Sequence, residues 1–494
     1  MCATTKMLQS CISLPLDEPQ LLDVVEKAKD WAIMHGAAMR SKQNFDQDAL
    51  LFAPFILTPS SFPRKEFQKA VELQPLLNEL IHSVAHDSQF LLTTLSSTEK
   101  VDEFTRSLIT IYRTVLDEGI AQPISLGLLR SDLMLETRCD DECSGRTRAF
   151  NAYCCWKQVE INTIASGFGH LGPSSKYLQS YVLTELGHQD KLVNLPENNA
   201  LSGLCDAMVE AWKLQARSSA AILFVVEDVT YNICDQRFHE FYIRKAYPHV
   251  AVIRRTLTQI SKTGKLGAGK ELLIDGTEAS VVYFRAGYEP GHYYGQAEWD
   301  ARLLIERSVA IKCPSIQYHL AGTKKVQQAL AKPEVLRRFV GDETKIEAIR
   351  DIFTGLYSLD QDEGGDEAMA LALSDPERFV LKPQREGGGN NVYGEDIPAA
   401  LKAMSNEERS AWILMERIFP PLSTGYMVRP NGPSPPPLVQ LVSELGIFGT
   451  IIGSKDNVLY NKQVGHMLRT KLSSSNEGGV AAGSGALDSP YLID

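Results

Sequence analysis

Residues 379–396, FVLKPQREGGGNNVYGED, combine the side chains that a phosphate-binding loop needs. The strand-like start of this segment carries Lys382, and a triple glycine beginning at Gly387 follows Glu386. A flexible glycine loop lets backbone N–H groups close over phosphates, a lysine supplies positive charge, and a carboxylate can bind Mg²⁺. These residues predict a nucleotide-phosphate site, although a hairpin loop made mobile by its glycines would have the same composition.

A second glycine- and lysine-containing segment, GKLGAGKE at residues 264–271, has P-loop spacing as far as Lys270. Glu271 stands where a P-loop has the Ser or Thr that binds Mg²⁺. The segment also follows a helical pattern and leads into a strand-like one, whereas a P-loop follows a strand and opens a helix. We therefore expect a surface turn here.

The tripeptide EIN at residues 160–162 is a candidate for metal binding. Alternation along a strand places Glu160 and Asn162 on one face, and both offer the hard oxygen donors that Mg²⁺ prefers. Alternating polar residues on a solvated strand face would look the same. The pattern is compatible with a metal site and does not by itself require one.

Nine cysteines are scattered along the chain, an odd number that suits reduced thiols better than a disulfide framework. Four of them cluster at Cys139, Cys143, Cys154 and Cys155. Their spacing is not that of a paired CxxC zinc site, and no histidine lies nearby. We do not expect a metal at this cluster.

The elements that must position these residues can be outlined from periodicity. The first 120 or so residues have apolar positions at helical spacing. From Ala220 the runs AAILFVVED and HVAVIRRTL flank a helical stretch, which predicts a βαβ unit, and an Asp275-Gly276 turn joins two further strands. RFVLKP and AWILMERIF read as buried strands, and the remainder to the C-terminus as antiparallel, so the fold class is α/β.

Composition limits the partners and the location. At 494 residues the chain is expected to form two or three lobes. A formal net charge of −11 without long single-sign runs argues against nucleic acid as the main partner, and no apolar run is long enough to cross a membrane. A cytoplasmic location is the default expectation, with secretion open if a signal peptide has been removed.

A series of segments resembles the eukaryotic glutathione synthetase family of ATP-grasp ligases. Besides the glycine-rich loop, LGLLRSDLM near Arg130 and later segments occur in the order and approximate spacing of that family. The later segments are KQVEINTIASGFGHL, CDQRFHEFY, VVYFRAGY, KCPSIQYHLAGTKKVQQALAKP, ILMERI, SELGIFG and LRTKLSSSNEGGVAAG. Only the first 50 or so residues and CDDECSGRTRAFNAYCC lack a distinctive counterpart.

The resemblance implies an α/β ATP-grasp fold with a main body, an inserted parallel α/β substrate lobe and a glycine-rich lid. It also implies a homodimer. The expected divisions are the main body at 1–218, the substrate lobe at 219–320, a connection at 321–356, the lid at 357–419 and the rest of the main body at 420–494.

The resemblance further implies a two-step reaction in which ATP phosphorylates the C-terminal carboxylate of γ-glutamylcysteine and glycine attacks the acyl phosphate. Arg469 and Lys382 would be catalytic, through stabilising charge on the transferred phosphoryl group. Two Mg²⁺ ions per ATP are expected, with Glu160, Asn162 and Glu386 as ligands. The implied nucleotide contacts are Lys324, Lys382, Gly387, Gly388, Gly389, Asn391, Tyr393, Met415, Glu416, Arg417, Ile418, Glu444, Lys471 and Glu477, the last usually Asp in the family.

The implied peptide and amine contacts are Arg130, Ala165, Ser166, Gly167, Thr230, Asn232, Gln236, Arg285, Tyr288, Arg469, Val480 and Ala481. Small residues at Ala481 and Ala482 go with glycine as the amine, whereas bulkier ones go with β-alanine. Arginines suit the peptide site because their planar fork pairs with a carboxylate through two bonds.

The chain departs from the family pattern at the peptide site. The usual serine-rich turn reads Ala165-Ser166-Gly167, and Thr230 replaces a glutamate that would suit the α-ammonium of the γ-glutamyl group. Asp228 or Glu227 could replace that acid, and the turn could bind through its backbone. The departures leave open a ligase of altered or weakened peptide preference, or a non-catalytic effector-like paralogue.

Overall fold

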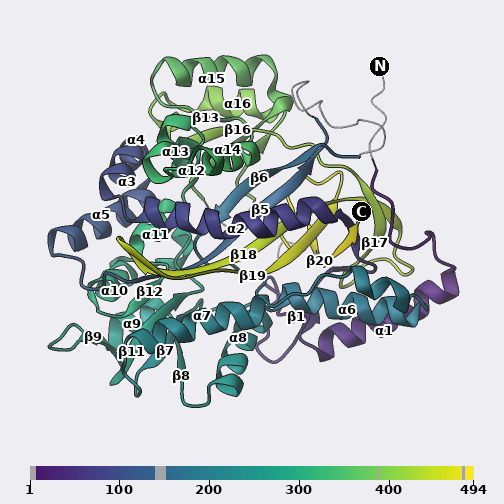
Figure 1. The fold of residues 1–494 in the computed structure, drawn as a ribbon, viewed down its shortest axis with the longest axis horizontal. Helices are drawn as coiled ribbons and strands as arrows, with labels where there is room; N and C mark the ends of the chain where they lie inside the picture. Colours follow the sequence, from purple (N-terminus) through teal and green to yellow (C-terminus); the bar gives the residue numbers. More distant parts are fainter. Residues whose placement is uncertain (1–6, 139–151, 386–388, 481–483) are drawn as a thin grey trace.

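The computed structural model describes residues 7–138, 152–385, 389–480 and 484–494. Its centre is a seven-stranded sheet in the order β17-β3-β20-β19-β18-β5-β6, antiparallel except for the β20–β3 pair. The long strands β18 and β19 form a hairpin that crosses the molecule (Figure 1). The strands are β3 (Phe55–Ile56), β5 (Ser125–Glu136), β6 (Cys155–Asn162), β17 (Ser423–Val428), β18 (Leu438–Ser454), β19 (Asn457–Leu472) and β20 (Gly485–Asp488).

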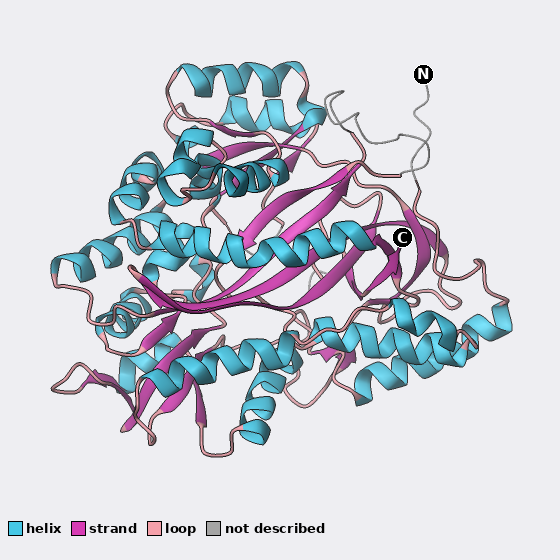
Figure 2. Ribbon diagram, in the orientation of Figure 1, coloured by secondary structure: helices cyan, strands magenta, loops and turns pink. Residues whose placement is uncertain are grey.

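Helices cover this sheet, with α2 lying across one face against β18 and β19 and with α6 and α7 contacting β19 (Figures 1 and 2). The aspartates Asp87 and Asp102 start α3 and α5 by accepting backbone N–H bonds, as helix caps do. The helices are α1 (Glu18–Met34), α2 (Arg64–Ala85), α3 (Ser88–Thr94), α4 (Ser96–Val101), α5 (Glu103–Asp117), α6 (Leu171–Glu185), η2 (Gln189–Asn194) and α7 (Ala200–Leu214).

The prediction that the first 120 residues are helical is largely confirmed, but it missed several short strands. Strands of two to four residues carry too little periodicity to be read from the sequence, and β3 and β4 are defined by pairing with distant segments. The missed strands are β1 (Ala38–Met39), β2 (Leu51–Phe52), β3 and β4 (Ser60–Pro63). β1 and β2 pair with each other, and β4 pairs with β21 (Pro490–Ile493).

A second, six-stranded sheet lies at the lower left in Figure 1. The βαβ unit is confirmed, since β7 and β8 are parallel and α8 connects them. The sheet is mixed, because β10 runs antiparallel to β9 and β11. Its elements are β7 (Ala221–Val225), α8 (Ile233–Ala246), β8 (Ala251–Arg255), α9 (Leu257–Thr263), β9 (Gly264–Leu266), β10 (Leu272–Ile274), β11 (Thr277–Phe284), η3 (Pro290–His292), α10 (Gln296–Arg307) and β12 (Ile311–Cys313).

Two turns in this sheet were predicted from the sequence. Asp275 and Gly276 both have positive φ and close the β10–β11 hairpin, as an Asp-Gly turn should. The segment with P-loop spacing, 264–271, forms β9 and the turn into β10, where the backbone N–H of Gly269 donates to Glu271. It opens no helix, so the expected surface turn is confirmed.

A third sheet, of four antiparallel strands in the order β13-β16-β14-β15, lies at the top of Figure 1 under α15 and α16. A run of helices joins it to the rest of the chain. The elements are α11 (Ile316–Ala321), α12 (Lys324–Leu330), α13 (Pro333–Phe339), α14 (Glu343–Ile352), β13 (Leu356–Ser358), α15 (Glu363–Ser374), η4 (Pro376–Arg378), β14 (Phe379–Pro383), β15 (Val392–Tyr393), α16 (Asp396–Ala403), η5 (Glu408–Ala411) and β16 (Trp412–Glu416).

One expectation about the cysteines needs correction. Cys154 is disulfide-bonded, so the expectation of reduced thiols does not hold there. The free cysteines among the described residues are Cys11, Cys155, Cys205, Cys234 and Cys313. Cys139 and Cys143 lie outside the described residues. Within the part that the structure describes, no helix is long and apolar enough to cross a membrane.

Candidate active site

The three sheets meet around one cavity of about 1860 Å³, including the part open to solvent. The central sheet supplies its floor, the six-stranded sheet one wall and the four-stranded sheet the other. We call the part beside the four-stranded sheet the nucleotide half and the part beside the six-stranded sheet the peptide half.

Strand register builds a row of charged residues across the floor. Arg469 on β19 lies opposite Glu444 on β18, and Asp132 on β5 lies opposite Glu160 on β6. Arg469 forms an ion pair with Glu444, and its guanidinium also lies 3.6 Å from Asp132. The alternation of these antiparallel strands thus brings three carboxylates and a guanidinium from distant parts of the sequence to one face.

Gly446 makes room for this row. It lies opposite Asp132, and a Cβ atom on it would be 2.8 Å from Asp132 Oδ1 and 2.9 Å from Arg130 Cδ. The space is occupied by a two-bond pair in which Arg130 Nε and a terminal nitrogen donate to the two oxygens of Asp132, at 2.6 and 2.7 Å. Asp132 has no exposed surface, so it fixes the direction of the Arg130 side chain.

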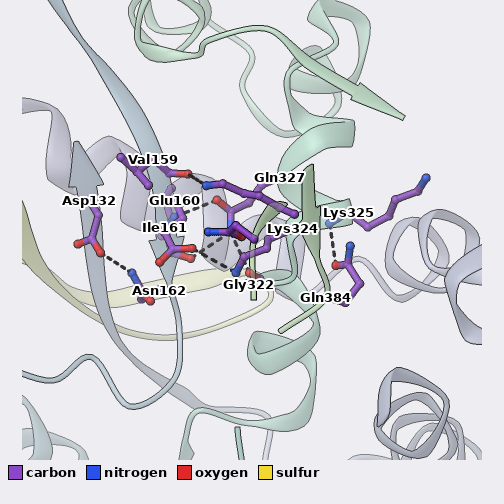
Figure 3. A network of polar contacts seen from close by, with 12 residues as sticks. Asp132, Val159, Glu160, Ile161, Asn162, Gly322, Lys324, Lys325, Gln327 and Gln384 are labelled. Carbon is purple, nitrogen blue, oxygen red and sulfur yellow. Dashed lines mark hydrogen bonds and ion pairs between the residues drawn. The ribbon is translucent and has the colours of Figure 1, made fainter. Parts of the chain in front are cut away.

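Glu160 faces Lys324, with 3.2 Å between carboxylate oxygen and Nζ (Figure 3). Lys324 begins α12, and Gln327 one turn later ties that helix to β6. The Gln327 amide accepts from the backbone N–H of Ile161 at 2.9 Å and donates to its carbonyl at 3.2 Å. Because β6 is the last strand of the sheet, Gln327 takes the place of a neighbouring strand and sets the distance between Glu160 and Lys324.

The charges around Glu160 favour its ionised form. Burial alone would raise the pKa of this carboxyl, but Lys324, Lys382 and Arg469 together lower it to about 2. Lys382 comes from β14 and its Nζ donates to the Val159 carbonyl at 3.4 Å. A cluster of three cations around one carboxylate is suited to holding further negative charge.

The nucleotide half is formed by the four-stranded sheet and the loops around it. Met415 and Glu416 end β16, with the backbone N–H of Glu416 bonded to the Gly355 carbonyl at 2.8 Å. Asn391 donates to the Tyr393 hydroxyl at 3.2 Å. The predicted residues that line this half are Lys324, Lys382, Asn391, Tyr393, Met415, Glu416, Arg417, Ile418, Glu444, Lys471 and Glu477.

Glu477 contacts the end of the glycine-rich loop. Its carboxylate accepts hydrogen bonds from the backbone N–H groups of Gly389 and Asn391, the second at 3.3 Å. Gly389 has positive φ but does not line the cavity. Glu386, Gly387 and Gly388 lie outside the described residues, so their predicted roles stay predictions.

Asp235 organises the peptide half. This fully buried carboxylate accepts from Arg285 at 3.0 Å and from the backbone N–H groups of Phe168, His170 and Leu171 at 3.0, 2.9 and 3.2 Å. Burial alone would raise its pKa, but Arg285 and these bonds hold the pKa below its usual range. Asp235 therefore fixes both the guanidinium and the loop that follows the β6 strand.

The turn at Ala165, Ser166 and Gly167 lines the cavity. Ala165 has φ of 58°, in the left-handed region, and the Ser166 hydroxyl donates inward to the Leu128 carbonyl at 2.7 Å. The Gly167 carbonyl accepts from Arg130 at 3.0 Å. With its one hydroxyl engaged in the fold, the turn presents mainly backbone to a ligand.

The other predicted peptide contacts are mostly brought together. Arg130, Asn232, Gln236, Arg285, Tyr288 and Arg469 all line the cavity. Thr230 and Val480 do not: Thr230 donates to the Glu227 carbonyl at 2.9 Å within its loop, and Val480 packs in an apolar core cluster. Ala481 and Ala482 lie outside the described residues.

Sequence reasoning missed Asp132, Asp235 and Gln327. Asp132 follows Arg130 by two residues, so strand alternation could have paired them. Asp235 and Gln327 gave no such signal, because their partners are 50 or more residues away.

Comparison with known proteins identifies the family. A family model for the ATP-binding domain of eukaryotic glutathione synthase matches residues 18–492. The chain belongs to the eukaryotic glutathione synthase family. It is similar to the glutathione synthetase of Homo sapiens, with 43% identity over 484 residues, 97% of this chain and 99% of that protein. It is also similar to that of Xenopus laevis, with 42% identity over 480 residues, 97% of this chain and 98% of that protein.

A solved structure of a glutathione synthetase-like effector from Globodera pallida, in apo form, matches with a TM-score of 0.76 and 25% identity. The match covers 97% of this chain and 98% of that chain. The family model and this solved structure both fit the α/β ATP-grasp fold that the resemblance implies. The greater identity to glutathione synthetases does not favour the effector-like alternative.

In this member of the glutathione synthase family, Glu160 and Asn162 offer oxygen atoms that suit a cation such as Mg²⁺. Glu160 is ionised and lines the cavity, while the Asn162 amide nitrogen donates to Asp132 at 3.0 Å, so a ligand role would fall to the amide oxygen. Among the described residues no group of three His, Cys, Asp or Glu could hold a metal. The third expected ligand, Glu386, is outside that part of the chain.

Proposed function

We propose that this protein is a glutathione synthetase, an ATP-dependent ligase that joins γ-glutamylcysteine to glycine and releases glutathione, ADP and phosphate. The observation that carries the proposal is the junction between the two halves of the cavity. There Glu160, Lys324, Lys382 and Arg469 gather where the nucleotide half meets the arginine-lined peptide half.

In the first step an oxygen of the peptide's C-terminal carboxylate attacks the γ-phosphorus of ATP. An O–P bond forms, the bond between the γ-phosphorus and the bridging oxygen breaks, and ADP leaves. Lys324 and Lys382 would neutralise the phosphoryl oxygens, and Arg469 would orient the carboxylate, because these cations surround one point of the cavity floor.

In the second step the glycine amine attacks the acyl carbon, the C–O bond to phosphate breaks and the amine loses a proton. Mg²⁺, when bound, would offset phosphate charge, and we assign it to Glu160, Asn162 and Glu386 with two ions per ATP. The small residues at Ala481 and Ala482 favour glycine over β-alanine as the amine. A homodimer in the cytoplasm completes the proposal.

The proposal is tested by ADP release from purified protein with ATP, Mg²⁺, γ-glutamylcysteine and glycine, each omitted in turn. We expect ADP and glutathione in equal amounts only when all four are present. ADP release that does not depend on the peptide would contradict the proposal, as would the absence of release with any combination.

A further inference from the structure

Glu227 lies in the peptide half, two residues beyond the end of β7. Parallel pairing of β7 with β11 brings the loops after these strands together, so that Glu227 faces Tyr288. The loop of Glu227 is closed by the bond from Thr230 to the Glu227 carbonyl. Its carboxylate is thus held by neighbouring strand ends at the cavity wall, with 18% of the side chain exposed.

The other acids that line the cavity have a cation or backbone N–H groups as partners in the described part of the chain. Glu160 has Lys324, Glu444 has Arg469, Glu416 has Arg378, and Glu477 has the backbone of the glycine-rich loop. The buried arginines of the peptide half are matched as well, Arg130 by Asp132 and Arg285 by Asp235.

Glu227 has weaker partners. The Tyr288 hydroxyl is 3.5 Å from its carboxylate, and the nearest basic nitrogen is His292 Nε2 at 3.9 Å. Burial, and to a smaller extent Lys42, lower the pKa of His292 to about 4, so this ring is neutral near pH 7. A buried carboxylate without a charged partner is costly, and a ligand cation would remove that cost.

The surroundings of Glu227 suit a cation that only donates hydrogen bonds. Asn232, at the start of α8, has a buried side-chain oxygen with no hydrogen-bond partner among the described residues, and it lines the same half of the cavity. Tyr231 and Tyr288 add aromatic walls. An ammonium group has three donors and no acceptor, so it could satisfy a carboxylate and an amide oxygen together.

We infer that Glu227 binds the α-ammonium group of the γ-glutamyl moiety, supplying the acid that the chain lacks at Thr230. The inference rests on the proposed function. Asp228, which the sequence left as an equal candidate, is exposed and does not line the cavity. The weakened peptide preference expected from Thr230 is then offset by a carboxylate from another position in the same loop.

The test is calorimetric binding of γ-glutamylcysteine and of glutarylcysteine, the same peptide without the α-amino group. The unmodified protein should prefer the amino form by about 10- to 150-fold, the range for hydrogen bonds to a charged group. Glu227→Gln should reduce this preference to about threefold or less, since a neutral amide lacks the charge. ATP affinity should be unchanged and shows that the variant folds.

Asp228→Asn is the matched control, because it removes one carboxylate from the adjacent residue and should leave the preference intact. A Glu227→Gln protein that keeps the full preference would overturn the inference. Loss of the preference in Asp228→Asn would do so too. ADP release is measured separately. If the unmodified protein prefers the amino form but releases no ADP, the proposed function is contradicted. If it releases ADP normally and Glu227→Gln keeps the full preference for the amino form, only this inference is contradicted.

A second measurement needs only the unmodified protein. Burial and Glu289 raise the pKa of Glu227 to about 7, so binding an ammonium at pH 7 should expel about half a proton. The release is read from binding heats in buffers of different ionisation enthalpy, and glutarylcysteine should release none. Equal release for both peptides would overturn the inference. The charged or titratable groups around this carboxylate are Lys42, Tyr231, Arg285, Tyr288, Glu289, His292 and Tyr294.

Discussion

The two halves of the cavity use charge in different ways. In the peptide half, Arg130 and Arg285 are each held by an aspartate with no exposed surface, so their directions are set before a ligand arrives. At the junction with the nucleotide half, Lys324 and Arg469 pair with the partly exposed Glu160 and Glu444. The first arrangement fixes the geometry of recognition, and the second keeps cations and carboxylates within reach of an incoming triphosphate.

The largest effect is expected at the junction with the nucleotide half. Glu160→Gln should lower kcat by about 1,000-fold, since it removes the carboxylate at the centre of three cations and a proposed Mg²⁺ ligand. The affinity for γ-glutamylcysteine should change little, because the variant leaves both arginine–aspartate pairs in place. Steady-state kinetics measures both, with the exposed Glu347→Gln as control. A variant that keeps more than a tenth of the activity would refute the role of Glu160.

The peptide half should respond in the opposite manner. Asp235→Asn should lower kcat/KM for γ-glutamylcysteine by about 100-fold and leave KM for ATP within about threefold, because Arg285 loses its fixed direction. Removing one member of a buried pair should also lower the free energy of unfolding by about 3–5 kcal/mol. Urea denaturation measures that change. If the variant has normal stability and normal peptide kinetics, Asp235 does not hold Arg285 of the peptide half in its binding direction.

The smallest effect is a pH dependence confined to the peptide half. With the pKa of Glu227 raised to about 7, its ionised fraction grows between pH 6 and 8, so the Kd of γ-glutamylcysteine should fall about tenfold over that interval. The Kd in Glu227→Gln should stay flat. Without peptide, the raised pKa of Glu227 has the opposite effect on stability. Between about pH 4.5 and pH 7 the folded state binds more protons than the unfolded state, so the free energy of unfolding decreases as the pH rises through that window.

Much of the fold was predictable, because local patterns decide it. The βαβ unit from Ala221 and the Asp275-Gly276 turn follow from apolar runs and turn residues. The Glu160 and Asn162 pair followed from alternation on β6. The short strands β3 and β4 were missed, because pairing with distant segments defines them.

The peptide half shows why the rest could not be predicted. Thr230 was assigned to the pocket from its place in the family pattern, but its hydroxyl is used within the loop, and Glu227 faces the cavity instead. The turns of a loop decide which of its residues points inward, and the periodicity of the sequence does not show this. Asp235 likewise acts through backbone groups far away in the sequence.

The central claim is that the two halves meet so that the peptide carboxylate receives the phosphoryl group of ATP. It is tested most directly by labelling the C-terminal carboxylate of γ-glutamylcysteine with ¹⁸O and analysing the released phosphate by mass spectrometry. The account predicts that each phosphate carries one oxygen from the peptide, since the acyl C–O bond breaks when glycine attacks. Unlabelled phosphate would mean that water attacks ATP, and it would contradict the account.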